Sequence, residues 1–289
     1  MSKLGVITDG IERDDFEHAL NVAREYDLKF AEIQFLWGKE VGDLTATELR
    51  KVEKLLQQRD MQVSCISRHN FQGMAVGDTE IGDEHYTRHM AAFKRCIETA
   101  KALGSPLVRI MSFRKEMILF GENGAEEWNE STGAWDKFKS LVTPIIEVAE
   151  AEDMNIVVET GNNAIITSGH LGRRLIDELG TNRLKVLWDP ANSLYCSEPA
   201  FPDGYDALKG GYLGHLHIKD AVVDIPKAKV RQCEMGTGSM APFFEDMARE
   251  LKIDGYQGAI SLESVYHPDG GTYEEGFRAS IEKMKNIFG

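Results

Sequence analysis

Short apolar segments alternate with longer amphipathic segments along the whole chain. The short segments are rich in Val, Ile and Leu, which is typical of buried strands, and the longer ones repeat apolar residues at helical spacing. Strands are predicted at 4–8, 30–36, 62–67, 107–113, 155–160, 184–189, 213–219 and 259–264. Helices are predicted at 14–26, 45–59, 85–103, 135–152, 168–179, 240–251 and 272–288, with a short turn near 205–209. Eight strands that each precede a helix predict an α/β fold, a closed (β/α)8 TIM barrel.

Several predicted helices carry suitable residues at their ends. Thr45 with Glu48 three residues later predicts a capping box at the start of the helix 45–59. Gly104 and Gly180 stand where two helices should end, and glycine tolerates the left-handed conformation that such ends often require. These signals support the boundaries that the apolar pattern predicts.

A doubly wound sheet is the competing fold, and it requires a glycine-rich phosphate loop after an early strand. The first strand instead runs into Thr8-Asp9-Gly10-Ile11-Glu12, without G-x-G-x-x-G. A TIM barrel needs about 250 residues, and the chain has 289. We therefore expect one barrel domain over 1–289. The longest irregular stretch, 114–133, is expected to act as a lid, with Trp128 covering the substrate.

Composition limits the partners that the protein can have. The net charge is −14, whereas nucleic-acid binders usually carry a basic surface. No apolar run reaches the roughly 18 residues of a membrane helix. The residues before the first predicted strand lack the basic region and apolar stretch of a secretory signal peptide. The four cysteines are widely spaced, which favours reduced thiols. We expect a cytoplasmic protein without nucleic-acid or membrane partners, and the sequence is compatible with a homo-oligomer.

Each of the last four predicted strands ends in an acidic or imidazole side chain: Glu159, Asp189, His217 and Glu263. In a parallel barrel, these strand ends form one rim, where catalytic residues gather. Side chains alternate along a strand, so Leu216 and Ile218 facing the helices would leave His217 facing the axis. Three carboxylates on one rim without a counter-charge would repel one another strongly. One divalent metal ion, bound by all four residues, would remove this repulsion.

The donor set favours particular ions. Three carboxylates and one imidazole suit Mn²⁺ best, with Mg²⁺, Co²⁺ or Zn²⁺ as alternatives. His215 has the same parity as His217 but lies two residues deeper, so we expect it to support the metal ligands rather than bind the ion. Taken singly, such residues are more often surface groups or hydrogen-bonded core residues. Their occurrence on four consecutive strands, at the same end, favours the metal site.

These segments resemble the xylose-isomerase-like barrel superfamily, which includes ketose 3-epimerases, hydroxypyruvate isomerase, inosose dehydratase and isomerase, and endonuclease IV. The resemblance covers the chain and is most specific from Val157 onward. The motifs that carry it are V-V-E-T at 157–160, W-D-P-A-N at 188–192, G-H-L-H-I-K-D at 214–220, G-T-G at 236–238 and S-L-E-S at 261–264. It implies a TIM barrel with the metal ligands Glu159, Asp189, His217 and Glu263.

Departures from the pattern narrow the reaction. Ketose 3-epimerases carry a histidine where this chain has Asn192, and an arginine where it has Val223. Endonuclease IV also has a histidine that corresponds to His69. Its three-metal site requires several further histidines, however, and this chain has Asn192 where one of them should stand. Together with the acidic charge, this argues against DNA repair and separates the chain from the ketose 3-epimerase pattern.

The expected function is a metal-dependent sugar isomerase or epimerase. It would transfer a proton next to a carbonyl through a metal-stabilised enediolate, with Glu159 and Glu263 as the catalytic acid and base. The alternative is a metal-dependent lyase or dehydratase that acts by β-elimination on a keto-sugar, keto-glycoside or keto-inositol. A sugar-binding barrel without catalysis is the third interpretation.

Other residues near the predicted rim are candidates for binding the sugar. They are Lys219, Asn192, His69, Arg109, Trp37, Trp188 and His170. Two of them have structural alternatives. Lys219 could instead pair with Asp220 or Glu159, and Arg109 could form a buried ion pair with Glu32.

Overall fold

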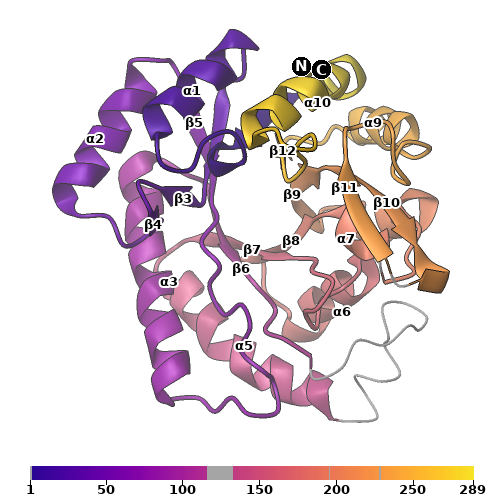
Figure 1. Ribbon diagram of the computed structural model, residues 1–289. Helices are drawn as coiled ribbons and strands as arrows, with labels where there is room; N and C mark the ends of the chain where they lie inside the picture. The colour runs from indigo at the N-terminus through magenta and orange to yellow at the C-terminus, as the bar shows by residue number, and fades with distance from the viewer. Residues whose placement is uncertain (1, 116–132, 195, 228) are drawn as a thin grey trace.

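Eight parallel strands form a closed barrel in the computed structural model, which describes residues 2–115, 133–194, 196–227 and 229–289 (Figure 1). Around the barrel, the strands follow the order β1-β12-β9-β8-β7-β6-β5-β2. Their bounds are Lys3–Ile7 (β1), Phe30–Ile33 (β2), Gln62–Ile66 (β5), Leu107–Ile110 (β6), Asn155–Glu159 (β7), Leu184–Trp188 (β8), Leu213–Ile218 (β9) and Ala259–Leu262 (β12). The predicted TIM barrel is confirmed.

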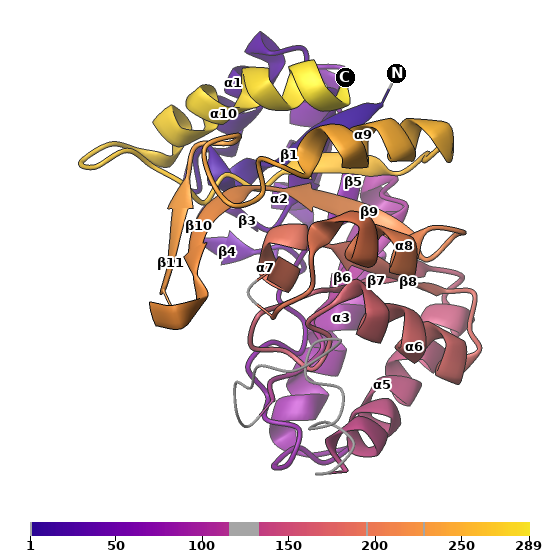
Figure 2. The ribbon, with the colours of Figure 1, turned by 90° about the vertical axis from the view of Figure 1, so that its right-hand side faces the viewer.

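Helices surround the barrel, and the two chain ends lie close together in both ribbon views (Figures 1 and 2). The α-helices are Phe16–Glu25 (α1), Ala46–Gln57 (α2), Glu84–Leu103 (α3), Ala134–Ala151 (α5), Gly169–Leu179 (α6), Pro190–Leu194 (α7), Tyr205–Leu208 (α8), Phe244–Ile253 (α9) and Tyr273–Phe288 (α10). Shorter helical turns are Thr8–Gly10 (η1), Ala200–Gly204 (η3) and Ile225–Lys227 (η4). No helix in the described ranges is long and apolar enough to cross a membrane.

The predicted helix ends are present. The Thr45 side chain accepts a hydrogen bond from the backbone N–H of Glu48, and the Glu48 carboxylate accepts one from the backbone N–H of Thr45. Gly104 and Gly180 end α3 and α6 with φ of 69° and 63°, in the left-handed region that glycine enters without steric cost. Local sequence therefore determines where these helices begin and end.

The strands are shorter than predicted at their carboxyl ends, because the backbone there turns out of the barrel ladder to build the rim. The predicted strand 107–113 ends at Ile110, and the N–H of Met111 donates instead to the carbonyl of Asn70. The predicted strand 30–36 is interrupted after Ile33. The next residues, Phe35–Leu36 (β3), pair antiparallel with Lys39–Glu40 (β4).

A second hairpin follows β9 and was not predicted. Asp220–Asp224 (β10) pairs antiparallel with Lys229–Cys233 (β11), and the hairpin projects from the barrel (Figure 2). Asp220 organises the segment after it: its carboxylate accepts the backbone N–H groups of Gly236, Gly238 and Met240. This turn delays the following helix, which was predicted from 240 but begins at Phe244.

Apolar side chains occupy two separate layers. The larger core lies between the strands and the surrounding helices, and it includes Phe93, Ile145 and Phe277. A small cluster of Cys65, Val157 and Leu187 fills the barrel interior. The polar side chains of the candidate site stand at the carboxyl ends of the strands.

Candidate metal centre

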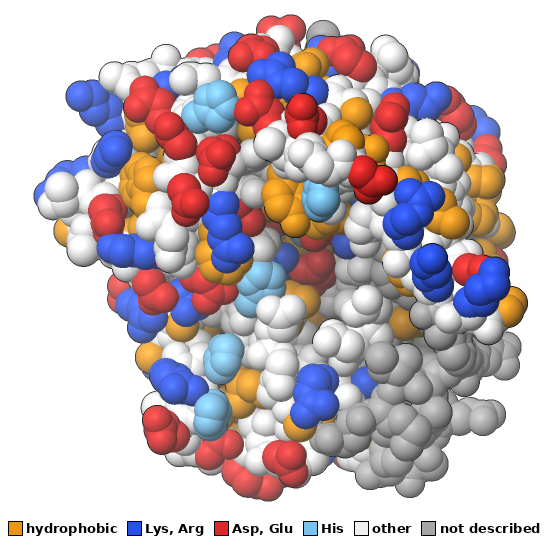
Figure 3. All heavy atoms as spheres, viewed as in Figure 1, with side chains coloured by type: hydrophobic (Ala, Val, Ile, Leu, Met, Phe, Trp, Pro, Cys, Tyr) orange, Lys and Arg blue, Asp and Glu red, His pale blue; other side chains and the backbone are white. Residues whose placement is uncertain are grey.

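The four predicted ligands lie together at the carboxyl ends of β7, β8, β9 and β12. One ligand atom from each of Glu159, Asp189, His217 and Glu263 lies within 4.8 Å of the others. We call these four residues the rim cluster. The side chains of Asp189 and His217 are fully buried, Glu159 is 5% exposed and Glu263 is 18% exposed. Figure 3 shows the hollowed face of the molecule in the same orientation as Figure 1.

Two cations sit among the carboxylates of the rim cluster. The Arg109 guanidinium lies 2.7 Å from the Glu159 carboxylate. The Lys219 ammonium lies 2.5 Å from Asp189 and 2.6 Å from Glu263. The structural alternatives considered from the sequence are therefore wrong: Arg109 pairs with Glu159 rather than Glu32, and Lys219 pairs with Asp189 and Glu263.

The carboxylates of the rim cluster differ sharply in acidity. Burial raises the pKa of Asp189 to about 7, because the attraction of Lys219 only partly offsets it. Burial also disfavours the ionised Glu159, but Arg109 and His217 outweigh it and lower the pKa of Glu159 to about 2. For Glu263, burial is outweighed by Lys219 and His217, so its pKa is lowered. One rim thus holds carboxyl groups with opposite pKa shifts, a feature typical of functional sites.

The rim cluster fits a divalent cation. The buried Nδ1 of His217 has no hydrogen-bond partner among the described residues; its nearest carboxylate oxygens, on Glu159 and Glu263, are 3.6 Å and 3.8 Å away. The Oδ2 atom of Asp189 contacts the Lys219 ammonium but lacks a properly directed hydrogen bond. A buried imidazole nitrogen beside carboxylate oxygens provides, once deprotonated, the donor set that Mn²⁺, Co²⁺ or Zn²⁺ accepts.

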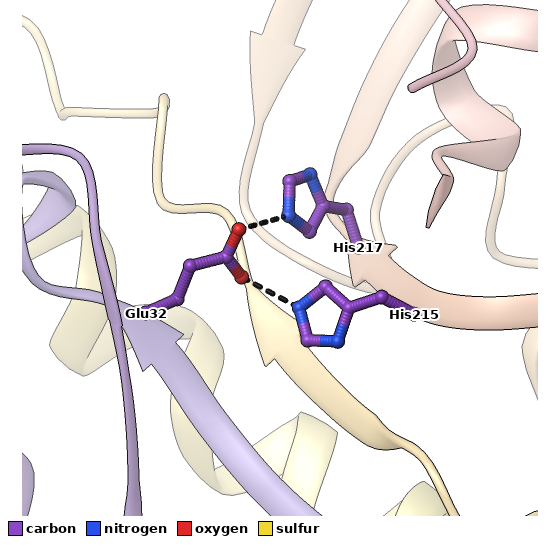
Figure 4. A group of neighbouring side chains, drawn as sticks. All are labelled: Glu32, His215 and His217. Atoms are coloured by element: carbon purple, nitrogen blue, oxygen red, sulfur yellow. Dashed lines mark hydrogen bonds and ion pairs between the residues drawn. The ribbon is translucent and has the colours of Figure 1, made fainter. Parts of the chain in front are cut away.

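Below the rim, Glu32 joins the two histidines of β9 (Figure 4). The Nε2 atoms of His215 and His217 lie 2.7 Å and 2.9 Å from the two oxygens of Glu32, and all three side chains are fully buried. We call these three residues the interior cluster. Burial disfavours a charged Glu32, but His217 and His215 outweigh this and hold its pKa well below the ordinary value.

The role of Glu32 was missed from the sequence, which suggested it only as a partner for Arg109. Its position between Ala31 and Ile33, both buried toward the helices, was the available signal for an inward side chain. The two histidines contact it only because barrel closure brings β2 and β9 to face each other across the interior. His215, predicted to support the ligands, also lies 3.2 Å from the hydroxyl of Ser261.

Besides Arg109 and Lys219, two more of the predicted sugar-binding residues connect to the rim cluster, directly or through a neighbour, by hydrogen bonds. Asn192, on α7, donates its backbone N–H to the Asp189 carboxylate and its side-chain amide to the Thr160 carbonyl. His69 lies 3.2 Å from the Gln34 amide, whose oxygen accepts from Arg109. Asn192 therefore links the segment that carries Asp189 to the residue after β7, and His69 is connected through Gln34 to the Arg109–Glu159 pair.

The remaining predicted residues make their contacts elsewhere. Trp188 is fully buried against Tyr205 in the layer between strands and helices, because it alternates with the inward-facing Asp189. The ring centroids of Trp37 and Phe16 lie 6.0 Å apart, and the Lys51 ammonium lies over the Trp37 ring. His170 is in the first turn of α6, with its backbone N–H donating to Glu198. Trp128, the predicted lid residue, lies outside the described residues.

A cleft of about 420 Å³ borders the rim cluster at Glu263. It is formed by the loops after β1 and β12 and by Gln34, and its lining includes Asp9, Glu12 and Arg13. Burial raises the pKa of Asp9, which accepts the backbone N–H of Phe35. A larger cavity of about 820 Å³ lies at the opposite end of the barrel, among the amino ends of the strands. Active sites of TIM barrels sit at the carboxyl ends, so the smaller cleft adjoins the candidate site.

The closed barrel and the rim cluster define a TIM-barrel protein with a candidate metal centre at the carboxyl ends of β7, β8, β9 and β12. A model of the xylose isomerase-like TIM barrel family matches residues 20–287. The chain belongs to this family. A comparison with curated proteins found no match.

Three solved structures illustrate the likeness in fold. The apo form of 3-keto-D-glucoside 4-epimerase, YcjR, from E. coli has 16% identity and a TM-score of 0.73, over 99% of this chain and 100% of that one. The probable 3-DHS dehydratase AsbF from Bacillus anthracis, involved in petrobactin synthesis, has 14% identity and a TM-score of 0.71, over 96% and 97%. The IolI protein with a binding zinc atom has 15% identity and a TM-score of 0.71, over 99% and 98%.

Proposed function

We propose that this protein is a divalent-metal-dependent isomerase or epimerase of a sugar or keto-sugar, which moves a proton at a carbon next to a carbonyl. The observation that carries the proposal is the convergence of three carboxylates and an unpartnered imidazole nitrogen within 4.8 Å at the catalytic end of the barrel. Family membership supports it, and so does the 3-keto-D-glucoside 4-epimerase named above.

The metal, when bound, polarises the substrate carbonyl and stabilises the negative charge that forms when the neighbouring carbon loses its proton. Glu159, Asp189, His217 and Glu263 would hold it. Mn²⁺ is our first choice for this donor set, with Mg²⁺, Co²⁺ or Zn²⁺ as alternatives. A zinc atom in the similar IolI structure supports a metal centre of this type.

Glu159 and Glu263 are the proposed proton carriers. Arg109 keeps Glu159 ionised, and an ionised carboxylate can accept a proton. Glu263 stands at the end of another strand, borders the cleft of about 420 Å³ and contacts the Lys219 ammonium, so it can take up or return a proton beside a sugar lying in that cleft. Return to the same carbon on the opposite face gives epimerisation, and return to the neighbouring carbon gives isomerisation.

A lyase or dehydratase is the second candidate, and the position of Lys219 favours it. The ammonium of this lysine lies within 2.6 Å of both Asp189 and Glu263, where it could donate a proton to a departing oxygen. Asn192 and Val223 stand where ketose 3-epimerases have a histidine and an arginine. This departure from the epimerase pattern is compatible with an elimination reaction. The similar fold of AsbF, a probable dehydratase, also supports this candidate.

We also propose a small-molecule sugar as the partner and the cytoplasm as the location. All four cysteines are free and buried, in keeping with a reducing compartment. A homo-oligomer is compatible with this proposal.

The test is a screen of keto-sugars, free and phosphorylated, in D₂O with NMR detection of deuterium incorporation. The protein is first stripped with a chelator and then reloaded with Mn²⁺, Mg²⁺, Co²⁺ or Zn²⁺. We expect exchange of one carbon-bound hydrogen only after reloading. A dehydrated or cleaved product would establish the lyase instead, whereas sugar binding without exchange would leave a binding protein. Equal exchange in the stripped and reloaded protein would contradict metal dependence.

A further inference from the structure

The interior cluster contains one carboxylate for two imidazoles, and the carboxylate divides its oxygens between them. Oε2 of Glu32 faces Nε2 of His215, and Oε1 faces Nε2 of His217 (Figure 4). The Ser67 hydroxyl also donates to Oε1. Glu32 is therefore surrounded by donors and acts as an acceptor toward each of its three neighbours.

We propose that Glu32 is a positioning residue for the metal centre, which fixes His217 so that its Nδ1 lone pair faces Glu159, Asp189 and Glu263. The proposal rests on the metal-dependent function proposed above. Glu32 contacts neither the expected ion nor the substrate; it acts through His217.

The chemistry of imidazole decides which nitrogen of His217 can bind a metal. A neutral histidine carries one N–H and one lone pair on its two ring nitrogens, so a partner that accepts at one nitrogen places the lone pair on the other. Glu32 accepts at Nε2 of His217. In the neutral ring that a metal ion binds, the lone pair then lies on Nδ1, the atom without a hydrogen-bond partner in the described part of the chain.

The surroundings of Nδ1 match a ligand position. The distances of 3.6 Å to Glu159 and 3.8 Å to Glu263 exceed hydrogen-bond length. Ligands of one ion each lie about 2.1 Å from it and hence about 3 Å from one another. Small movements of these side chains would bring Nδ1 and the carboxylates to that spacing. A histidine ligand whose other nitrogen donates to a carboxylate is a common arrangement in metal centres.

The orientation of the ring also depends on Glu32. His215 and His217 lie edge to face, with an interplanar angle of 81° and ring centroids 5.5 Å apart. Contact with both oxygens of one buried carboxylate holds this angle, since rotation of either ring would break its bond to Glu32. The anchor comes from β2, across the barrel from β9, so the metal ligand is held from outside its own strand.

A second metal ion within the interior cluster is the competing interpretation, since Glu32, His215 and His217 also form a group with metal-ligand chemistry. The distances of 2.7 Å and 2.9 Å are those of direct hydrogen bonds, which leave no gap between the nitrogen and oxygen atoms. The positioning role therefore predicts one ion per chain.

Cobalt binding to the full chain tests the proposal. Glu32→Leu removes both acceptors and should weaken Co²⁺ affinity, measured by competition with a chelator, about 10- to 100-fold. It should also change the visible absorption spectrum of bound Co²⁺, which reports the ligand set. Ser67→Ala is the matched control: it removes a donor from Glu32 but keeps both histidine contacts, and it should bind Co²⁺ within about twofold of wild type.

The outcomes separate the two proposals. No Co²⁺ binding by wild type would overturn the metal centre itself. Binding by wild type that Glu32→Leu leaves unchanged would overturn only the role of Glu32, and so would two ions per chain. Because Glu32→Leu could fail to fold, wild type with ¹⁵N-labelled histidine and bound Zn²⁺ gives an independent measurement. NMR should find the His217 proton on Nε2, and a proton on Nδ1 would refute the proposal.

Discussion

The rim cluster and the interior cluster share His217 but differ in how their charges are balanced. In the interior cluster, one carboxylate meets two imidazoles, and both of its oxygens have partners at hydrogen-bond distance. In the rim cluster, three carboxylates face two cations and one imidazole nitrogen that has no hydrogen-bond partner in the described part of the chain. Nδ1 of His215, in the interior cluster, also has no hydrogen-bond partner among the described residues. The two clusters therefore differ in what surrounds the unpartnered nitrogen: Nδ1 of His217 has the carboxylates of Glu159 and Glu263 beside it, where a ligand can be received.

The largest effect is expected at Glu263. Glu263→Gln removes a proton carrier and should reduce solvent deuterium exchange at least about 100-fold, the range of general acid–base catalysis. Elemental analysis separates loss of proton transfer from loss of metal. Glu245→Gln, an exposed change on α9, serves as the control. Full exchange in Glu263→Gln would remove this residue from the mechanism.

His217 belongs to both clusters, so its removal should disturb both. His217→Ala deletes the nitrogen ligand that we propose for the metal and leaves Glu32 with one imidazole. We expect less than half of the wild-type metal content by elemental analysis. An unchanged metal content per chain would indicate that His215 binds the ion instead. The metal centre would then not be confined to the rim cluster.

Arg109 balances the charge of the rim cluster, and its loss should cost stability. Arg109→Gln leaves Glu159 buried without its cation, which should lower the free energy of unfolding at pH 7 by about 3 to 5 kcal/mol. The pKa of Glu159 is lowered to about 2 from 4.5, so the pair contributes stability above about pH 4.5 and loses it as the pH falls toward 2. Urea unfolding at pH 7 and pH 3 should show the difference shrinking.

Arg183→Gln provides the contrast, because Arg183 pairs with Asp153 on the surface, where 32% of the arginine side chain and 86% of the aspartate side chain are exposed. Exposed pairs contribute about 0 to 1 kcal/mol. Equal losses in the two arginine variants would show that burial does not distinguish the rim pair.

A pH-dependent effect on stability is expected from the raised pKa of Asp189. Its pKa rises from 3.8 to about 7 on folding, so the stability linked to its proton is present at low pH and lost as the pH rises toward 7. The metal-free protein should gain at most about 1.4 kcal/mol per pH unit from this group as the pH falls between these values. Thermal melting of metal-free Asp189→Asn should show a weaker pH dependence than wild type, and an equal dependence would contradict the assignment.

The fold was predictable because its signals are local. Apolar periodicity located the strands and helices, and Thr45, Gly104 and Gly180 marked helix ends. The carboxyl ends of the strands were less predictable, since hydrogen bonds between distant loops end them. The hairpin β10–β11 was missed because Asp220, whose carboxylate gathers three backbone N–H groups, gives no local strand signal.

The membership of the rim cluster was predictable for a different reason. Parallel strands of a barrel end on one rim, so the fold and the parity of each strand were enough to predict that these four side chains lie together. The same alternation explains why Trp188 was wrongly predicted to bind the sugar. It precedes the inward-facing Asp189, so its side chain faces the helices. The sequence could not tell which cation pairs with which carboxylate, because that depends on the reach of long side chains across the rim.

The sequence by itself determined the barrel, the family and the residues that could bind a metal, because these follow from periodicity and strand ends. Only the tertiary structure decided that Arg109 holds Glu159, that Lys219 lies between Asp189 and Glu263, and that Glu32 joins His215 to His217. These contacts join residues 30 to 185 positions apart in the chain. They form when the barrel closes, since closure places strands from both ends of the chain around one interior.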